Sequence, residues 1–131
     1  MNKTLIFTAT YNESKNIAQL IEKIINLNLN VDILIVDDNS PDGTSKIIEK
    51  LKKKFSNIFL EKRTGKLGLN TAHIFGYEFA LKHQYKNLIT MDADLSHDPD
   101  EIPNIIKLLD DNAFVIGSRY MKGGKNDMKK L

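Results

Sequence analysis

The sequence predicts an α/β protein: a Rossmann-like, mainly parallel sheet with helices on both faces. Short apolar runs, such as the β-branched residues 33–36, alternate with helical stretches, such as residues 17–25, where the apolar residues recur at offsets of 3, 4, 7 and 8. Such strands are typical of parallel sheets covered by helices on both sides. The length of 131 residues and the hydrophobic fraction of 41% suit one domain with a substantial core.

The expected elements follow one another in strict alternation. Strands are expected at residues 4–8, 33–36, 58–61, 88–91 and 113–116, of which the third is the weakest. Helices are expected around the apolar positions of residues 17–25, 47–55, 72–80 and 102–109, and Pro103 is compatible with a first helical turn. Residues 1–122 are expected to form the domain, and the glycine- and lysine-rich residues 123–131 a flexible tail or truncated loop.

Composition excludes several classes of protein. The net charge of +2, with basic and acidic residues intermingled, argues against nucleic-acid binding. The lack of cysteine excludes disulfides and thiolate metal sites. No apolar run approaches the about 20 residues of a transmembrane helix, and residues 1–10 resemble a strand rather than a signal peptide. A cytoplasmic location is therefore expected.

Polar residues gather where the expected strands end. They occupy residues 10–13, 37–40, 92–94 and 117–119, and three of these four groups contain carboxylates. In open α/β sheets, ligands bind beyond the carboxyl ends of the strands. The sequence therefore predicts a binding site at this edge.

Asp92 and Asp94 are the strongest candidates for metal ligands. Residues two apart in extended backbone project to the same side, so the two carboxylates would repel each other unless a cation lay between them. Hard oxygen ligands suit Mg²⁺ or Mn²⁺, which also take phosphate oxygens and could neutralise a departing diphosphate. The alternative is that these aspartates only cap the following turn or helix.

Asp37 and Asp38 follow the second strand. Asp38 could accept a hydrogen bond from a base or a ribose. The alternative is that one of the pair braces the turn at residues 40–44 through backbone N–H groups.

Tyr11 and Glu13 follow the first strand. Tyr11 could stack on a base, and Glu13 could hold a ribose hydroxyl. The alternative is a helix N-terminus that begins at Asn12 or Ser14, where Glu13 is favoured by the helix dipole.

Two further side chains and one loop complete the candidates. Arg119, after the fifth strand, suits a phosphate or an ion pair with one of the aspartates. His97 is a candidate for a supporting group or a base, although a lone histidine more often has a structural role. The loop with Gly65, Lys66 and Gly68 lacks the spacing of a P-loop.

Five stretches together resemble a known family. The sequence is similar to the family 2 glycosyltransferases of the GT-A fold, and most closely to the dolichol- or polyprenol-phosphate mannosyltransferases. The matching stretches run in order along nearly the whole chain: residues 9–13, 36–44, 65–69 with Gly76, 91–97 with Pro99, and 117–120.

The resemblance implies a donor site for a nucleotide sugar, GDP-mannose in particular. Asp92, Asp94 and Arg119 would be the catalytic residues, and Ser96, which stands where some members have glutamine, would join the two aspartates at the metal. The residues implied to bind the donor are Ala9, Tyr11, Glu13, Val36, Asp38, Asp92, Ala93, Asp94 and Arg119.

The resemblance also implies an acceptor and a location. The acceptor would be a polyprenyl (dolichyl) phosphate, glycosylated with inversion for glycolipid or glycoprotein biosynthesis. Peripheral membrane contact at the cytosolic face is expected. Catalytic domains of the family extend beyond 131 residues, so the chain is expected to be truncated at its C-terminus.

Three alternatives stay open at this point. The first is transfer of another sugar, such as glucose, to a polyprenyl phosphate or a different acceptor. The second is a fragment that binds the donor without turnover. The third is a receiver-like signalling domain, although the first expected strand lacks the acidic pair of receivers and the fifth is followed by Ser118-Arg119 rather than lysine.

Overall fold

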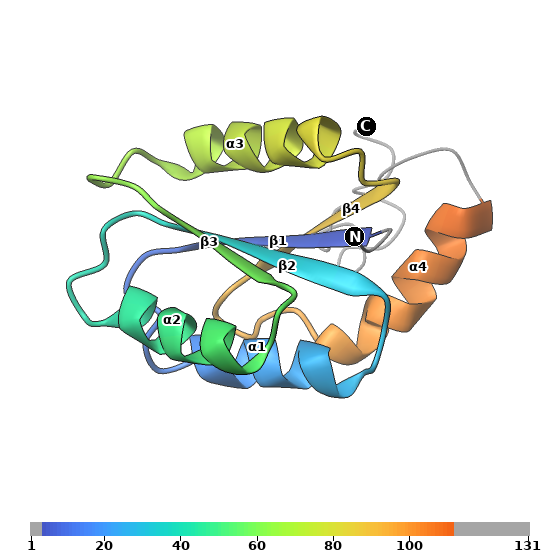
Figure 1. Ribbon diagram of the computed structural model, residues 1–131, viewed down its shortest axis with the longest axis horizontal. Helices are drawn as coiled ribbons and strands as arrows, with labels where there is room; N and C mark the ends of the chain where they lie inside the picture. The colour runs from blue at the N-terminus through green and yellow to red at the C-terminus, as the bar shows by residue number, and fades with distance from the viewer. Residues whose placement is uncertain (1–3, 112–131) are drawn as a thin grey trace.

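The computed structural model describes residues 4–111, which form a parallel four-stranded sheet in the order β3-β2-β1-β4 with helices on both faces (Figure 1). Helix α3 lies over one face, and α1 and α2 lie over the other (Figure 1). The elements are β1 (Thr4–Thr10), α1 (Ile17–Asn26), β2 (Val31–Asp37), α2 (Thr44–Lys54), β3 (Ile58–Lys62), α3 (Leu69–Lys82), β4 (Asn87–Asp92), a 3₁₀ turn η1 (Pro99–Glu101) and α4 (Ile102–Asp111).

The strands divide their side chains between two apolar clusters, as the alternation of a strand requires. In β1, Ile6 joins a cluster with the buried faces of α1, α2 and α4. Its neighbours Leu5 and Phe7 join a second cluster beneath α3. Both faces of β1 and β2 are buried, which explains why these strands are apolar throughout.

The fold class predicted from the sequence is confirmed, and so are the four strands and four helices expected within residues 4–111. The strands run one or two residues beyond the expected ends, since hydrogen bonding continues into polar residues such as Asp37 and Asp92. The fifth expected strand, at residues 113–116, and the expected tail at 123–131 lie outside the described residues.

The strand order contradicts the receiver-like alternative. Receiver domains have the order 2-1-3-4-5, in which the first strand lies between the second and third. Here β3 pairs with β2 and β4 pairs with β1, so β3 cannot occupy the receiver position. The receiver hypothesis is therefore wrong.

Helix α3 approaches the sheet closely at Gly76. A Cβ atom added there would lie 2.7 Å from Cδ1 of Phe7, so a glycine is needed for this contact.

The outer side of α3 carries exposed apolar residues, namely Leu69, Ile74, Tyr77 and Leu81. Within residues 4–111, every helix is too short or too polar to cross a bilayer.

Candidate active site at the carboxyl edge of the sheet

The register of the strands brings the predicted polar segments together at one edge. Thr10 pairs with Asp37, Ala9 pairs with Asp92, and Asp37 pairs with Lys62. The segments that follow β1, β2, β3 and β4 therefore begin side by side, as the rule for parallel sheets predicts.

Asp37 holds the edge together from within. Its side chain accepts hydrogen bonds from the hydroxyl of Thr10 at 2.6 Å, the hydroxyl of Ser40 at 2.6 Å and the amide of Ser40 at 3.0 Å. The residue is 1% exposed. Asp37 is thus the member of the pair that braces the turn, which confirms that alternative for this residue.

The loop after β1 is fastened to the turn after β2 by its amides. The N–H groups of Asn12, Glu13 and Ser14 donate to Ser40 Oγ at 2.8 Å, Thr44 Oγ1 at 3.0 Å and Asp42 Oδ2 at 3.0 Å, respectively. The expectation that α1 starts at Asn12 or Ser14 is wrong, because these amides are bound by another loop and the helix begins at Ile17.

Asp42 is stabilised as an anion by the same turn. Burial raises the pKa of its carboxyl, but hydrogen bonds from Thr44 and Ser14 outweigh this effect and lower the pKa to about 2. Gly43 adopts a φ of 88°, in the left-handed region that favours glycine, directly before α2.

Asp38 lies at the centre of a network with the loop after β3. Its Oδ2 accepts from the amides of Leu67 and Gly68, each at 3.1 Å, and its Oδ1 accepts from Nε of Arg63. Arg63 also donates to Thr71 Oγ1 at 2.8 Å and to the carbonyl of Gly68 at 2.9 Å. Both charged side chains are 9% exposed, so the pair clamps residues 63–68 onto the edge of the sheet.

Tyr11 lies at the surface of this edge, 39% exposed. The ammonium group of Lys66, from the clamped loop, lies 4.4 Å from the centre of its ring, within cation–π range. Glu13 is half-buried, and its Oε1 accepts from the side-chain amide of Asn16 at 3.3 Å. Tyr11 is thus exposed at this edge, with the Lys66 ammonium over its ring.

Asp92 is the last residue of β4, and Asp94 lies in the turn that follows it. Both are exposed, whereas Ala93 between them is 3% exposed. Hydrogen bonds from the hydroxyl and amide of Ser96 lower the pKa of the Asp94 carboxyl, so it is ionised at neutral pH. The geometry therefore presents two carboxylates to solvent beside the start of the loop after β1.

This pair fits a hard divalent cation. Two carboxylates leave most coordination positions to phosphate and water oxygens, which is how Mg²⁺ is usually bound beside phosphates. Among residues 4–111, no group of three or more acidic or histidine side chains could hold a metal by itself.

Two predicted residues are not brought to this surface. Val36 is fully buried in the cluster beneath α3. Arg119 lies outside the described residues.

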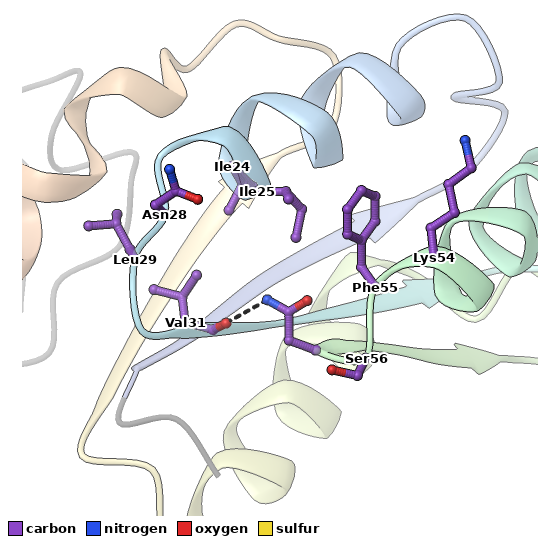
Figure 2. Close-up of a pocket in the computed structure, with 9 residues that line it drawn as sticks. Ile24, Ile25, Asn28, Leu29, Val31, Lys54, Phe55 and Ser56 are labelled. Atoms are coloured by element: carbon purple, nitrogen blue, oxygen red, sulfur yellow. Dashed lines mark hydrogen bonds between the residues drawn. The ribbon is translucent and has the colours of Figure 1, made fainter.

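A hollow of about 310 Å³ lies at the opposite edge of the sheet, between the ends of α1 and α2, and Figure 2 shows Val31 and Phe55 on its walls. That hollow contains none of the predicted site residues.

Arg63 is the residue of this site that the sequence analysis missed. It directly follows β3, so the rule that led to the other strand ends applies to it equally. The signal was present but weak, because the expected third strand was short and only Ile58 of β3 is fully buried.

Comparison with known proteins identifies the family to which the chain belongs. The model of the glycosyl transferase family 2 matches residues 5–131. Polyprenol monophosphomannose synthase of Mycolicibacterium smegmatis is 37% identical over 124 residues, which are 93% of this chain and 47% of that protein. Dolichol-phosphate mannosyltransferase of Pyrococcus furiosus is 38% identical over 126 residues, 94% of this chain and 35% of that protein. The chain thus spans less than half the length of these two relatives.

A solved structure shares the fold. The mannosyltransferase PcManGT from Pyrobaculum calidifontis, in complex with GDP-Man and Mn²⁺, matches with a TM-score of 0.68 and 23% identity, over 82% of this chain and 32% of that one. The fold and the acidic edge thus define a protein of the GT-A class. More particularly, the chain belongs to the family 2 glycosyltransferases.

Proposed function

We propose that this chain is the donor-binding part of a mannosyltransferase that transfers mannose from GDP-mannose to a polyprenyl phosphate, with inversion and with Mg²⁺ or Mn²⁺. The observation that supports it most is the pair of exposed carboxylates, Asp92 at the end of β4 and Asp94 in the turn that follows. Asp92 pairs in register with Ala9, two residues before Tyr11. The names of the two relatives and the ligands of PcManGT favour this sugar, this acceptor class and this cation.

Two groups of residues would bind the two parts of the donor. The nucleoside would lie along Ala9, Tyr11 and Glu13, with Val36 and Asp38 behind them, and the diphosphate would lie at Asp92-Ala93-Asp94. A divalent cation held by the two aspartates, with Ser96 nearby, would supply positive charge to the leaving diphosphate. Arg119 stays a predicted phosphate ligand beyond the described residues.

The reaction requires alignment more than proton transfer. An oxygen of the acceptor phosphate attacks the anomeric carbon, and the bond from that carbon to the diphosphate oxygen breaks with its electron pair. Attack from the face opposite the leaving group inverts the configuration. Because a phosphate monoester is already an anion near neutral pH, the protein has to position the reactants and stabilise the leaving charge.

Calorimetry of GDP binding tests the proposal. GDP is expected to bind in the presence of Mn²⁺ and to lose most of its affinity in EDTA. Asp94→Asn should remove the Mn²⁺ dependence and leave the fold intact, whereas the matched control Asp100→Asn, an equal charge change at an exposed residue nearby, should bind like the wild type. Equal affinity with and without Mn²⁺, or Mn²⁺ dependence retained in Asp94→Asn, would contradict the assigned site.

Two further measurements separate the alternatives. Competition between GDP and UDP, followed by assay of labelled GDP-mannose and UDP-glucose with a polyprenyl phosphate, distinguishes mannose transfer from glucose transfer. Donor binding without any transfer would support a donor-binding fragment. Transfer of mannose by the chain alone would show that the described edge and the residues after it suffice for turnover.

A further inference from the structure

The loop that carries Asp92 and Asp94 folds back on itself. Leu95 adopts a φ of 66°, a left-handed conformation that is strained for a branched side chain and that reverses the chain. The amide of Ser96 donates to Asp94 Oδ1 at 2.9 Å. The reversal brings His97 back to the end of β4, five positions after Asp92.

His97 contacts Asp92 twice. Its Nδ1 accepts a hydrogen bond from the main-chain N–H of Asp92 at 3.2 Å. Its Nε2 lies 3.8 Å from Oδ2 of the same residue. The ring is well buried, with 7% of the residue exposed, whereas the side chain of Asp92 is 49% exposed.

The first contact determines where the ring carries its proton. A nitrogen that accepts a hydrogen bond from an amide has a free lone pair, so the neutral ring is protonated at Nε2. The N–H group is therefore at Nε2, the nitrogen that lies 3.8 Å from Oδ2 of Asp92. A 3.8 Å separation is too long for a hydrogen bond but close enough for electrostatic attraction between the N–H group and the carboxylate.

We propose that His97 is a positioning residue, which orients the Asp92 carboxylate for the cation and the diphosphate. The inference rests on the function proposed above and names the residue that supports its metal ligand. An exposed aspartate samples several rotamers, and a fixed N–H group 3.8 Å from its Oδ2 favours one of them. Partners of this kind around metal ligands commonly contribute a factor of roughly 10 to 100 in metal affinity.

The same contacts argue against a role of His97 as a general base. Its Nδ1 is occupied by the Asp92 amide, and its Nε2 carries the proton in the neutral ring. A base must present a lone pair within hydrogen-bonding reach of the proton that it removes. His97 thus acts through Asp92 and not on the acceptor.

Two variants of the full chain separate the two contacts. His97→Asn places an amide oxygen close to the position of Nδ1 and can keep the bond to the Asp92 amide, whereas His97→Phe removes both contacts and keeps the ring volume. Mn²⁺ affinity is measured in the presence of GDP, and GDP affinity is also measured in EDTA. We expect both variants to lose roughly 10- to 100-fold in Mn²⁺ affinity, because neither keeps the N–H group at Nε2, with metal-free GDP affinity close to that of the wild type. His97→Asn, which can keep the bond to the Asp92 amide, should have a higher melting temperature than His97→Phe.

Nitrogen NMR of the wild-type ring gives a readout that needs neither metal nor turnover. The expected result is an unprotonated Nδ1 and a protonated Nε2 in the neutral ring; the opposite tautomer would overturn the inference even if His97→Phe failed to fold. Unchanged Mn²⁺ affinity in His97→Phe, or equal losses of metal and metal-free nucleotide binding, would also overturn it while leaving the proposed function standing. If the wild type shows no effect of Mn²⁺ on GDP binding, the proposed function fails and the positioning role fails with it.

Discussion

Replacement of Arg63 by methionine removes the charged clamp between β2 and the loop after β3. Methionine keeps much of the apolar length of the side chain but donates no hydrogen bond. The variant loses the bond to Asp38 and the bonds to Thr71 Oγ1 and the Gly68 carbonyl. The carboxylate of Asp38 stays buried, and among residues 4–111 the amides of Leu67 and Gly68 remain as its partners.

The size of the effect follows from burial. The side chains of Arg63 and Asp38 are each 9% exposed, so solvent screens the pair only weakly. Removal of one partner from a buried pair costs about 3–5 kcal/mol, because the remaining charge lacks compensation. A hydrogen bond to a charged group contributes about 1.5–3 kcal/mol and one to a neutral partner about 1 kcal/mol, which supports the same range for Arg63→Met.

The coupling energy between Arg63 and Asp38 is measured by urea denaturation of four proteins: the wild type, Arg63→Met, Asp38→Asn and the double variant. The double variant should lose less stability than the two single losses combined, by about 0.5–3 kcal/mol. Lys62→Met is the matched control, since Lys62 is adjacent in sequence but its side chain is 55% exposed and pairs with Glu49 at 3.5 Å. That surface pair should contribute at most about 1 kcal/mol. Strictly additive losses, or a loss in Arg63→Met no larger than in the control, would refute the clamp.

Two further predictions concern the packing of α3 and the acid stability of the turn before α2. Gly76→Ala should lower the free energy of unfolding by up to about 2 kcal/mol in urea denaturation. A Cβ atom 2.7 Å from the ring of Phe7 overpacks the core at a cost of about 1–3 kcal/mol, and the higher helix propensity of alanine offsets about 1 kcal/mol of that cost. A more stable variant would contradict the close approach. Asp42→Asn should lower the free energy of unfolding at neutral pH, and the difference from the wild type should shrink as the pH falls from 3.8 towards about 2. The reason is that a carboxyl with a lowered pKa stabilises the fold only while it is ionised, here with hydrogen bonds from Thr44 and Ser14. A difference in unfolding free energy that does not change with pH would count against those bonds.

The layers of the fold were predictable because the apolar pattern alone determines them. Residues such as Ile6 and Phe7 are apolar on opposite sides of one strand, which requires cover on both faces of a sheet. The strand order was not accessible in this way. The order depends on which edges pair, and the pairing of β3 with β2 is visible only in the register.

The candidate site was predictable as a location and only partly as a network. The carboxyl-end rule correctly places Thr10, Asp37 and Asp92 together. It could not assign the two neighbouring aspartates, because Asp37 and Asp38 differ only in which loop supplies their donors. The contacts of Arg63 and His97 depend on loop conformations, including the left-handed turn at Leu95, and no local sequence pattern encodes those conformations.

Paramagnetic broadening by Mn²⁺ tests the central claim most directly, because it locates the cation in the fold. Amide spectra of the ¹⁵N-labelled chain are recorded with GDP and Mg²⁺ and then with GDP and a small amount of Mn²⁺. The account predicts the strongest loss of signal at residues 92–97, weaker loss at residues 9–13, and full recovery in EDTA. Broadening centred elsewhere, such as around Lys54 and Phe55 at the opposite edge, or no broadening that depends on GDP, would contradict the assignment of Asp92 and Asp94 as the metal and diphosphate site.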